Sequence, residues 1–210
     1  MSECETKSQW CSLITPFILA GGKSQRMGTN KSFVKLDSRP LIEVVIQKVT
    51  DFFNKTPVLI TNQFTEYRYL GCEMVEDITK DKGPLGGIQA GLIKAATPYI
   101  FVFACDMPFI DKKMVHYMIN RLDKEDILIP RLENRVEPLH AIYSKQCLPV
   151  ISTYLKNDRR SVKSFFDEVH VVYIDQAEIN RLQVPEYCFL NINTAEELAN
   201  ARDYLGKLHL

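Results

Sequence analysis

The sequence predicts an α/β fold in which helices cover both faces of a mostly parallel sheet. Short apolar runs at residues 17–20, 58–60 and 72–75 are typical of buried strands, and polar residues follow each of them. Helical patterns separate the three runs, so the order is strand, helix, strand, helix, strand. In sheets of this kind, ligands bind beyond the carboxyl ends of the strands.

The elements up to the middle of the chain follow from local patterns. Pro40 is expected to be the first residue of a helix that carries apolar residues as far as Phe52. A later helical segment contains glycines at 86, 87 and 91, which indicates that something packs close to its backbone. The continuous apolar run 99–104 predicts a central parallel strand, and Asp111 is placed to cap the next helix.

The second half of the chain alternates less cleanly. Strands are predicted at 127–130, 139–143 and 171–174, helices at 147–155 and 161–169, a charged loop at 131–137 and an extended stretch at 189–193. Thr194 and Glu197 are spaced as a capping box for the final helix. There is no internal repeat and no linker rich in Pro, Gly or Ser, so we expect one domain at 13–210 after a loose leader at 1–12.

Bulk properties exclude several classes of protein. Lysines plus arginines equal aspartates plus glutamates at 26 each, whereas a nucleic-acid-binding protein usually has a basic excess. The first residues do not resemble a signal peptide, and the longest apolar stretch, 99–105, is too short to span a membrane. The six cysteines are dispersed without a C-x-x-C pair, which favours reduced thiols in a cytoplasmic protein.

The stretch from Pro16 to Lys31 carries the strongest functional signal. Its apolar run stops at Gly21-Gly22, where the backbone is free to adopt positive φ and to approach a ligand closely. Lys23, Arg26 and Lys31 follow within the same loop. Bare backbone N–H groups flanked by cations are how proteins cradle a polyphosphate, so this stretch is the predicted active-site loop. The alternative is an ordinary strand and turn with surface cations.

Two better-known phosphate loops do not fit this stretch. A Walker A motif ending at Gly22-Lys23-Ser24 would need its leading glycine at position 17, which is Phe17. The spacing G-x-G-x-x-G fails because Gly21 and Gly22 are adjacent. The remaining pattern, L-A-G-G-x-S-x-R-M-G-x-x-K, resembles the signature loop of nucleotidyltransferases with a Rossmann-like domain. It is most similar to that of the molybdenum cofactor guanylyltransferases.

The resemblance covers most of the chain, including the Asp-Met-Pro that follows the run 99–104 and the closing N-I-N-T-A-E-E-L. It implies a single-domain Rossmann-like three-layer α/β/α nucleotidyltransferase fold with a mostly parallel central sheet. The implied reaction is attack by the terminal phosphate of molybdopterin on the α-phosphate of GTP, with release of pyrophosphate. The implied partners are GTP, the molybdopterin cofactor substrate, handover proteins and recipient molybdoenzymes, with no nucleic acid and no membrane.

The resemblance also assigns roles to the loop and to Asp106. Backbone groups of Leu19, Ala20, Gly21 and Gly22 would hold the triphosphate, and Arg26 and Lys31 would neutralise developing charge. Asp106 would hold Mg²⁺, a metal that prefers one or two carboxylates plus nucleotide phosphates. The alternative for Asp106 is a helix cap, but Asp111 fits that role better.

Other candidates rest on their place in the predicted fold. Asp77 ends a strand, which favours a nucleotide contact over a simple turn residue, and Asn62 or a neighbour is expected to read the guanine or ribose edge. Gly83, Pro84 and Leu85 resemble the family's G-P-L segment, where close backbone approach to the base and helix packing both explain the glycines.

Two further features, a basic turn and a histidine, have both a functional and a structural interpretation. Arg159-Arg160 matches a basic turn in the family and could meet a pterin phosphate, or it could be solvated surface. His140 on an apolar strand is expected to be a hydrogen-bonded core histidine and not a base.

Two rival functions remain from the sequence. One is another nucleotidyltransferase, either the cytidylyltransferase of the same cofactor pathway or a sugar-phosphate enzyme, and nucleotide selectivity would distinguish it. The other is a non-catalytic nucleotide-binding protein in cofactor delivery. Lys31 and Asp106 argue against that alternative, because a silent relative can lose its cations and its metal ligand freely.

Overall fold

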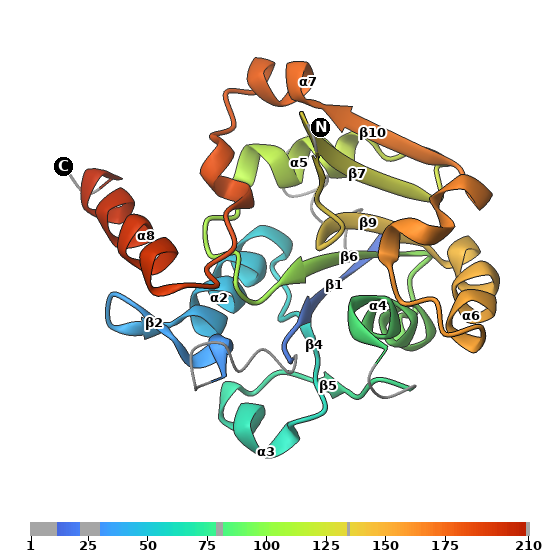
Figure 1. Ribbon diagram of the computed structural model, residues 1–210, viewed down its shortest axis with the longest axis horizontal. Coiled ribbons are helices and arrows are strands. Elements are labelled where there is room, and N and C mark those ends of the chain that lie inside the picture. The colour runs from blue at the N-terminus through green and yellow to red at the C-terminus, as the bar shows by residue number, and fades with distance from the viewer. Residues whose placement is uncertain (1–11, 22–29, 79–81, 134, 209–210) are drawn as a thin grey trace.

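The computed structural model describes residues 12–21, 30–78, 82–133 and 135–208, and it is built around one eight-stranded sheet (Figure 1). The strands of this sheet are β1 (Ile14–Leu19), β4 (Val58–Ile60), β5 (Met74–Val75), β6 (Tyr99–Ala104), β7 (Ile127–Leu132), β8 (Arg135–Val136), β9 (His140–Ser144) and β10 (Val171–Asp175). Continuous apolar runs form its centre, as expected of strands that are buried on both faces.

The strand order is β10-β7-β9-β6-β1-β4-β5, and β8 pairs with β7 as a hairpin. Strands β8 and β9 run in the direction opposite to that of the other strands of this sheet, which are parallel to one another. Across the middle of the sheet, Val75, Ile60, Leu19 and Ala104 are in register. The residues that follow these four strands therefore leave the same edge of the sheet, which is where ligands bind in α/β folds.

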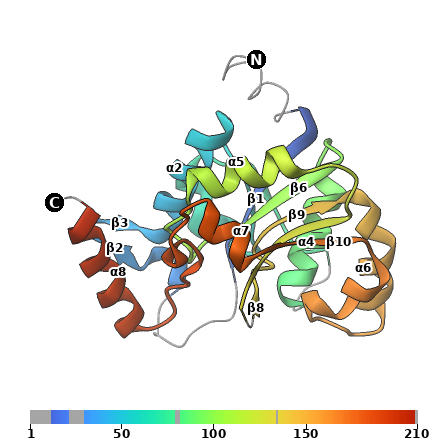
Figure 2. The same cartoon turned by 90° about the horizontal axis from the view of Figure 1, so that it is seen from above.

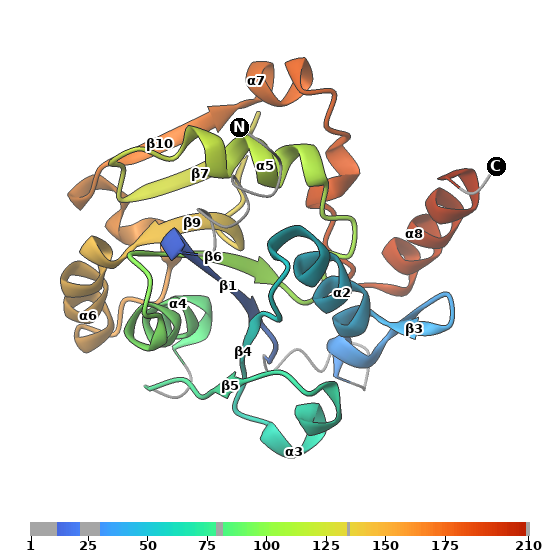
Figure 3. The same ribbon diagram turned by 180° about the vertical axis from the view of Figure 1, so that it is seen from behind.

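Two helical layers cover the two faces of the sheet (Figures 2 and 3). One layer contains α2 (Leu41–Phe53), α5 (Lys112–Arg121) and α7 (Gln176–Arg181). Its apolar stripe on α2 consists of Ile42, Val45, Val49 and Phe53, and these residues share one buried cluster with Phe101 and Phe103 of β6. The spacing of three and four residues places the stripe on one side of the helix.

The opposite layer contains α4 (Gly83–Lys94), α6 (Leu148–Lys156) and the 3₁₀ helix η4 (Val162–Glu168). Helix α4 lies very close to the sheet. A Cβ atom added at Gly87 would lie 3.1 Å from Leu19 Cδ2, and one at Gly91 would lie 3.2 Å from Ile100 Cδ1. The expectation that something packs against this glycine-rich helix is therefore confirmed.

A smaller unit flanks the sheet (Figure 2). It consists of the hairpin β2 (Lys35–Leu36) and β3 (Arg39–Pro40) and the last helix, α8 (Ala195–Leu208). The remaining elements are α3 (Phe64–Tyr67) and four 3₁₀ helices, η1 (Lys31–Phe33), η2 (Arg68–Leu70), η3 (Lys145–Cys147) and η5 (Glu186–Phe189). None of the helices that the structure describes is long and apolar enough to cross a membrane.

Several predicted boundaries need correction. Pro40 closes β3 and is the N-cap of α2, so the helix begins at Leu41. The segment 161–169 is a 3₁₀ helix and not an α-helix. The predicted charged loop 131–137 is mostly a hairpin, because β8 folds back on the end of β7. Residues 1–11 lie outside the described residues, so the leader stays a prediction.

Candidate active site

The described start of the predicted active-site loop, as far as Gly21, leaves the sheet beside the end of β6. The Leu19 carbonyl accepts a hydrogen bond from Cys105 N at 3.2 Å, and Ala20 N donates to the Ile60 carbonyl at 2.9 Å. Gly21 has φ +147°, a conformation that side chains disfavour, and an added Cβ would lie 3.5 Å from Thr61 Oγ1. The positive φ predicted for this turn is thus confirmed at Gly21, whereas Gly22 and Arg26 lie outside the described residues.

Asp106 lies two residues beyond the last residue of β6, at the edge defined above. Its backbone carbonyl accepts a hydrogen bond from Ile192 N at 2.9 Å, so the chain here is held by the segment before α8. Burial raises the pKa of the Asp106 carboxyl, while the nearby Lys31 ammonium lowers it. Asp111 caps α5 by accepting from Lys113 N and Met114 N, so the capping role assigned to it is confirmed and Asp106 is left for other chemistry.

Lys31, the second residue described after Gly21, lies at the same edge of the sheet. Its ammonium donates to Asn193 Oδ1, and its charge acts on the Asp106 carboxyl. The contact joins residues 162 positions apart in the chain. The structure therefore brings together two of the predicted catalytic groups, Lys31 and Asp106, and adds Asn193, which was not singled out from the sequence.

A polar network fixes the backbone on both sides of Lys31. Asn30 Nδ2 donates to Tyr67 Oη at 3.0 Å, and Tyr67 Oη donates to Ser32 Oγ at 2.8 Å. Ser32 Oγ in turn donates to the Cys105 sulfur at 3.3 Å. The residues before and after Lys31 are thus tied to the residue before Asp106. Burial raises the pKa of the Cys105 thiol to about 12, which keeps this sulfur protonated.

Asn62 and Asp77 are paired beyond the ends of β4 and β5. Asn62 Nδ2 donates to Asp77 Oδ2 at 3.1 Å, and Asp77 N donates to Asn62 Oδ1 at 3.0 Å. The pair fixes the orientation of a carboxylate that is only half-buried. The two residues, which were both predicted to contact the nucleotide, therefore lie next to each other beyond the ends of β4 and β5.

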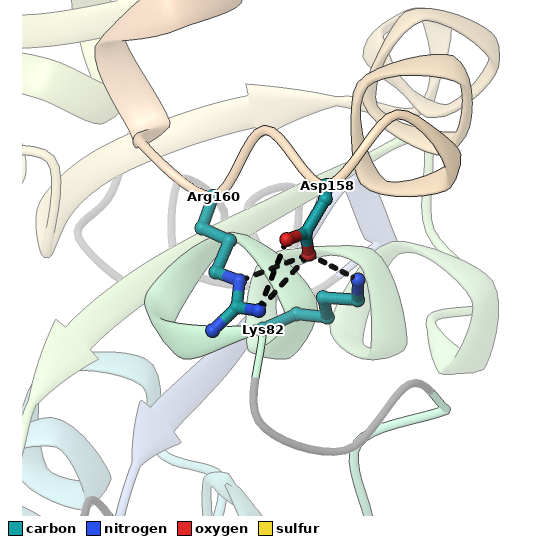
Figure 4. Close-up of polar contacts among 3 residues, drawn as sticks. All are labelled: Lys82, Asp158 and Arg160. Carbon is teal, nitrogen blue, oxygen red and sulfur yellow. Dashed lines mark hydrogen bonds and ion pairs between the residues drawn. The ribbon is translucent and has the colours of Figure 1, made fainter.

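Gly83, Pro84 and Leu85 form the first turn of α4. Gly83 has φ +63° with open space around its Cβ position, so the turn needs glycine for its conformation. Lys82, immediately before, pairs with Asp158 Oδ1 at 2.6 Å, and Asp158 also accepts from Arg160 (Figure 4). The predicted basic turn is therefore held against the start of α4 and carries its own counter-ion.

A further group of charged residues was not predicted from the sequence. Beyond the end of β7, a hollow of about 360 Å³ is lined by three cations, two anions and apolar side chains: Arg131, Arg135, Lys163, Glu133, Asp167, Val136, Phe166 and Tyr173. The Arg131 guanidinium stacks over the Tyr173 ring at 4.6 Å. The hollow depends on the β7–β8 hairpin, which the sequence pattern did not predict.

His140 lies in the core, but not as the hydrogen-bonded residue that was expected. The rings of Phe101, Phe103 and Phe189 surround it at centroid distances of 5.3–5.6 Å. Neither ring nitrogen has a hydrogen-bond partner among the described residues. The prediction of a hydrogen bond was therefore wrong, because the aromatic side chains around the ring offer no polar group.

Burial lowers the pKa of His140 to about 3, which makes the protein sensitive to acid. Below about pH 6.5 the unfolded chain takes up a proton at this residue and the folded chain does not. Between pH 7 and pH 5 the free energy of unfolding should therefore fall by roughly 2 kcal/mol more in the wild type than in His140→Leu. Urea unfolding at both pH values measures this difference. The exposed His170 provides the control, since His170→Leu should keep the wild-type pH dependence. Equal losses in all three proteins would contradict this account of His140.

A family model described as a MobA-like NTP transferase domain matches residues 16–174. The chain belongs to the MobA-like NTP transferase family. It is therefore a nucleotidyltransferase of the MobA type, and the matched residues include β1 from Pro16 onward, Lys31, Asp77, α4 and Asp106.

Curated relatives of this MobA-like protein extend the match beyond residue 174. It is 36% identical over 204 residues to a "Probable molybdenum cofactor guanylyltransferase" of Natranaerobius thermophilus, covering 92% of this chain and 97% of that protein. It is 34% identical over 190 residues to a "Molybdenum cofactor guanylyltransferase" of Desulfosudis oleivorans, covering 90% and 94%. The chain therefore spans nearly the whole length of both relatives.

Among solved structures, the MobA-like chain is similar to molybdopterin-guanine dinucleotide biosynthesis protein A from Archaeoglobus fulgidus. The TM-score is 0.80 at 26% sequence identity, and the match covers 92% of this chain and 99% of that one. The predicted fold class, an α/β nucleotidyltransferase fold with a mostly parallel central sheet, is thus confirmed.

Proposed function

We propose that this protein transfers GMP from GTP to the terminal phosphate of molybdopterin, releases pyrophosphate and requires Mg²⁺. The observation that carries the proposal is the meeting of Leu19–Gly21, Lys31 and Asp106 at one edge of the sheet. The names of the curated relatives and of the A. fulgidus structure support the choice of guanine and of the molybdenum cofactor.

The triphosphate is assigned to the loop that begins at Gly21. Cations and backbone N–H groups that lie beyond a strand end are suited to hold phosphates. The described backbone turns out of β1 directly beside Asp106, and Lys31 brings a positive charge back to that point. Gly22, which the sequence assigned to the triphosphate, and Arg26, which it assigned to neutralising developing charge, remain part of the proposal.

Asp106 is the residue that would hold Mg²⁺. Its carboxyl is half-buried at a strand end, and the positive charge of Lys31 acts on it. No group of three His, Cys, Asp or Glu side chains suited to a metal occurs among the described residues. A single carboxylate fits Mg²⁺ better than it fits Zn²⁺, because Mg²⁺ in nucleotide sites takes most of its ligands from phosphates and water. The ion would neutralise charge on the phosphates.

The base is assigned to the other side of the loop, at Asp77, Asn62 and the first turn of α4. An ionised carboxylate only accepts hydrogen bonds, so Asp77 suits the N–H groups on the guanine edge. Cytosine presents fewer donors there, which favours GTP over CTP. The pairing with Asn62 holds the Asp77 carboxylate in one orientation.

The acceptor is assigned to the basic turn that contains Arg159 and Arg160, which the Lys82–Asp158 ion pair holds against the start of α4. Its terminal phosphate is a phosphate monoester and is anionic at neutral pH, so its oxygen attacks without a strong general base. A new bond forms between this oxygen and the α-phosphorus of GTP, and the bond between the α-phosphorus and the bridging oxygen breaks. Pyrophosphate leaves with that oxygen. Positioning and charge neutralisation by Lys31 then account for catalysis.

Nucleotide selectivity tests this proposal. In the presence of Mg²⁺, GTP should raise the melting temperature more than ATP, CTP or UTP does, and GTP at 100 times its Kd should add about 2.7 kcal/mol to the stability. Asp77→Ala should reduce the difference between the rise in melting temperature caused by GTP and that caused by the other nucleotides. Glu76 is adjacent and exposed, so Glu76→Ala is the matched control and should leave this difference unchanged. Stabilisation by CTP alone would favour cytidylyl transfer, and equal stabilisation by all four would refute the guanine assignment.

We also place the reaction in the cytoplasm, as the sequence suggested. The cysteines of the described residues, Cys72, Cys105, Cys147 and Cys188, are all free thiols, which supports a reducing compartment.

A further inference from the structure

The segment that leads into α8 contacts both members of the proposed catalytic pair. Ile192 N donates to the backbone carbonyl of Asp106 at 2.9 Å. The next residue, Asn193, accepts the hydrogen bond from the Lys31 ammonium. Two consecutive residues, more than 80 positions away from Asp106 in the chain, thus touch the metal candidate and the catalytic cation.

Glu197 fixes this segment from the first turn of α8. Its Oε2 atom accepts hydrogen bonds from Asn193 N at 2.6 Å and from Thr194 N at 2.9 Å. Thr194 Oγ1 accepts from Glu197 N at 3.1 Å, which completes the predicted capping box. An ordinary capping box needs only the bonds between Thr194 and Glu197. The bond to Asn193 is additional, and it reaches the residue that holds Lys31.

The position of α8 also fits a role at the site. Figure 1 shows this helix beside the β2–β3 hairpin, away from the helical layers on the sheet. Its buried residues Leu198 and Ala201 belong to a small cluster separate from the two main ones. A strong cap at the N-terminus of such a helix contributes little to the stability of the main core. It does, however, determine where Asn193 lies.

From these contacts we infer that Glu197 is a positioning residue for nucleotidyl transfer, acting through Asn193 on the Lys31 ammonium. The inference rests on the proposed role of Lys31. An ionised carboxylate makes stronger hydrogen bonds to N–H groups than a neutral acceptor does, so two such bonds restrict the Asn193 backbone.

If Glu197 only caps α8, its loss should have the same effect as the loss of Thr194. If Glu197 also positions Asn193, its loss should lower activity more than the loss of Thr194 does. Thr194→Ala and Glu197→Ala each remove one half of the capping box, but only Glu197→Ala removes the bond to Asn193. Glu196 lies in the same first turn and is exposed, so Glu196→Ala controls for loss of a carboxylate there.

Kinetics of pyrophosphate release with GTP provide the first test. Glu197→Ala should lower kcat about 10-fold or more with little change in the KM for GTP, because a displaced catalytic group costs rate more than binding. Thr194→Ala and Glu196→Ala should stay within about threefold of wild type, and Glu197→Gln should recover most of the loss since glutamine also serves in capping boxes. In a Lys31→Ala background, Glu197→Ala should add little.

Amine labelling provides a second test that does not need the reaction. An amine-reactive ester should modify Lys31 several-fold faster in Glu197→Ala than in wild type, as measured by peptide mass spectrometry, while the exposed Lys35 labels equally in both. Unchanged Lys31 labelling, or equal kinetic losses in Thr194→Ala and Glu197→Ala, would overturn the role of Glu197. Faster labelling without any GTP-dependent turnover in the wild type would retain the contact and refute the proposed function.

Discussion

Asp106→Asn should lower turnover about 10³-fold at millimolar Mg²⁺, because charge neutralisation by a metal contributes several kcal/mol to the transition state. The substitution keeps the shape of the side chain, removes its charge and replaces one carboxylate oxygen by an NH₂ group. Binding of GTP without metal should change little, since the loop and the base contacts remain. The measurements are pyrophosphate release over a Mg²⁺ titration and GTP affinity in the presence of a chelator.

Asp111→Asn is the matched control for this variant. Asp111 lies five residues further along and caps α5 through Lys113 N and Met114 N. Asparagine caps helices about as well as aspartate does, so the control should keep both its stability and its activity. Near-normal turnover of Asp106→Asn at ordinary Mg²⁺ would show that the metal is held elsewhere.

Lys31→Ala should lower kcat by about 10² to 10³ while the melting temperature stays close to that of the wild type. The Lys31 charge acts on the Asp106 carboxyl, so the proposed site puts the ammonium near the α-phosphate and the departing pyrophosphate, where negative charge would build up. Its interaction should therefore strengthen in the transition state, so kcat should fall more than the affinity for GTP. Steady-state kinetics and thermal unfolding on the same preparation measure both effects.

Lys35→Ala tests whether any nearby lysine has this effect. Lys35 lies four residues further on, in β2, and its side chain is exposed. Its loss should change neither kcat nor the melting temperature measurably. If Lys31→Ala kept activity within a few-fold, or lost it only by unfolding, the assignment of the loop to the triphosphate would fail.

Local patterns predicted the elements that position the site. The run 99–104 coincides with β6, and the Asp111 cap is present. The capping box at Thr194 and Glu197 is present as well. In each case the signal lies within a few neighbouring residues, either as an unbroken apolar run or as a side chain spaced to meet a free backbone N–H group. The strand ends then placed Asp77 and Asp106 on one edge of the sheet.

Features that depend on distant contacts were not predictable in this way. The Lys31–Asn193 bond and the Tyr67–Ser32 bond join residues that no short pattern connects. Strand β8 has only two residues, too few to show an alternation of apolar and polar side chains. The missing hydrogen bonds of His140 result from three phenylalanines that converge only in the folded chain.

Transfer of a labelled phosphorus tests the central claim most directly. The protein is incubated with molybdopterin, Mg²⁺ and GTP that carries the label either at the α- or at the γ-phosphorus. The account predicts that the α-label appears in the pterin product and the γ-label in pyrophosphate, with CTP inactive as donor. Transfer of the γ-label to the pterin, or a product formed from CTP in place of GTP, would contradict guanylyl transfer by this protein.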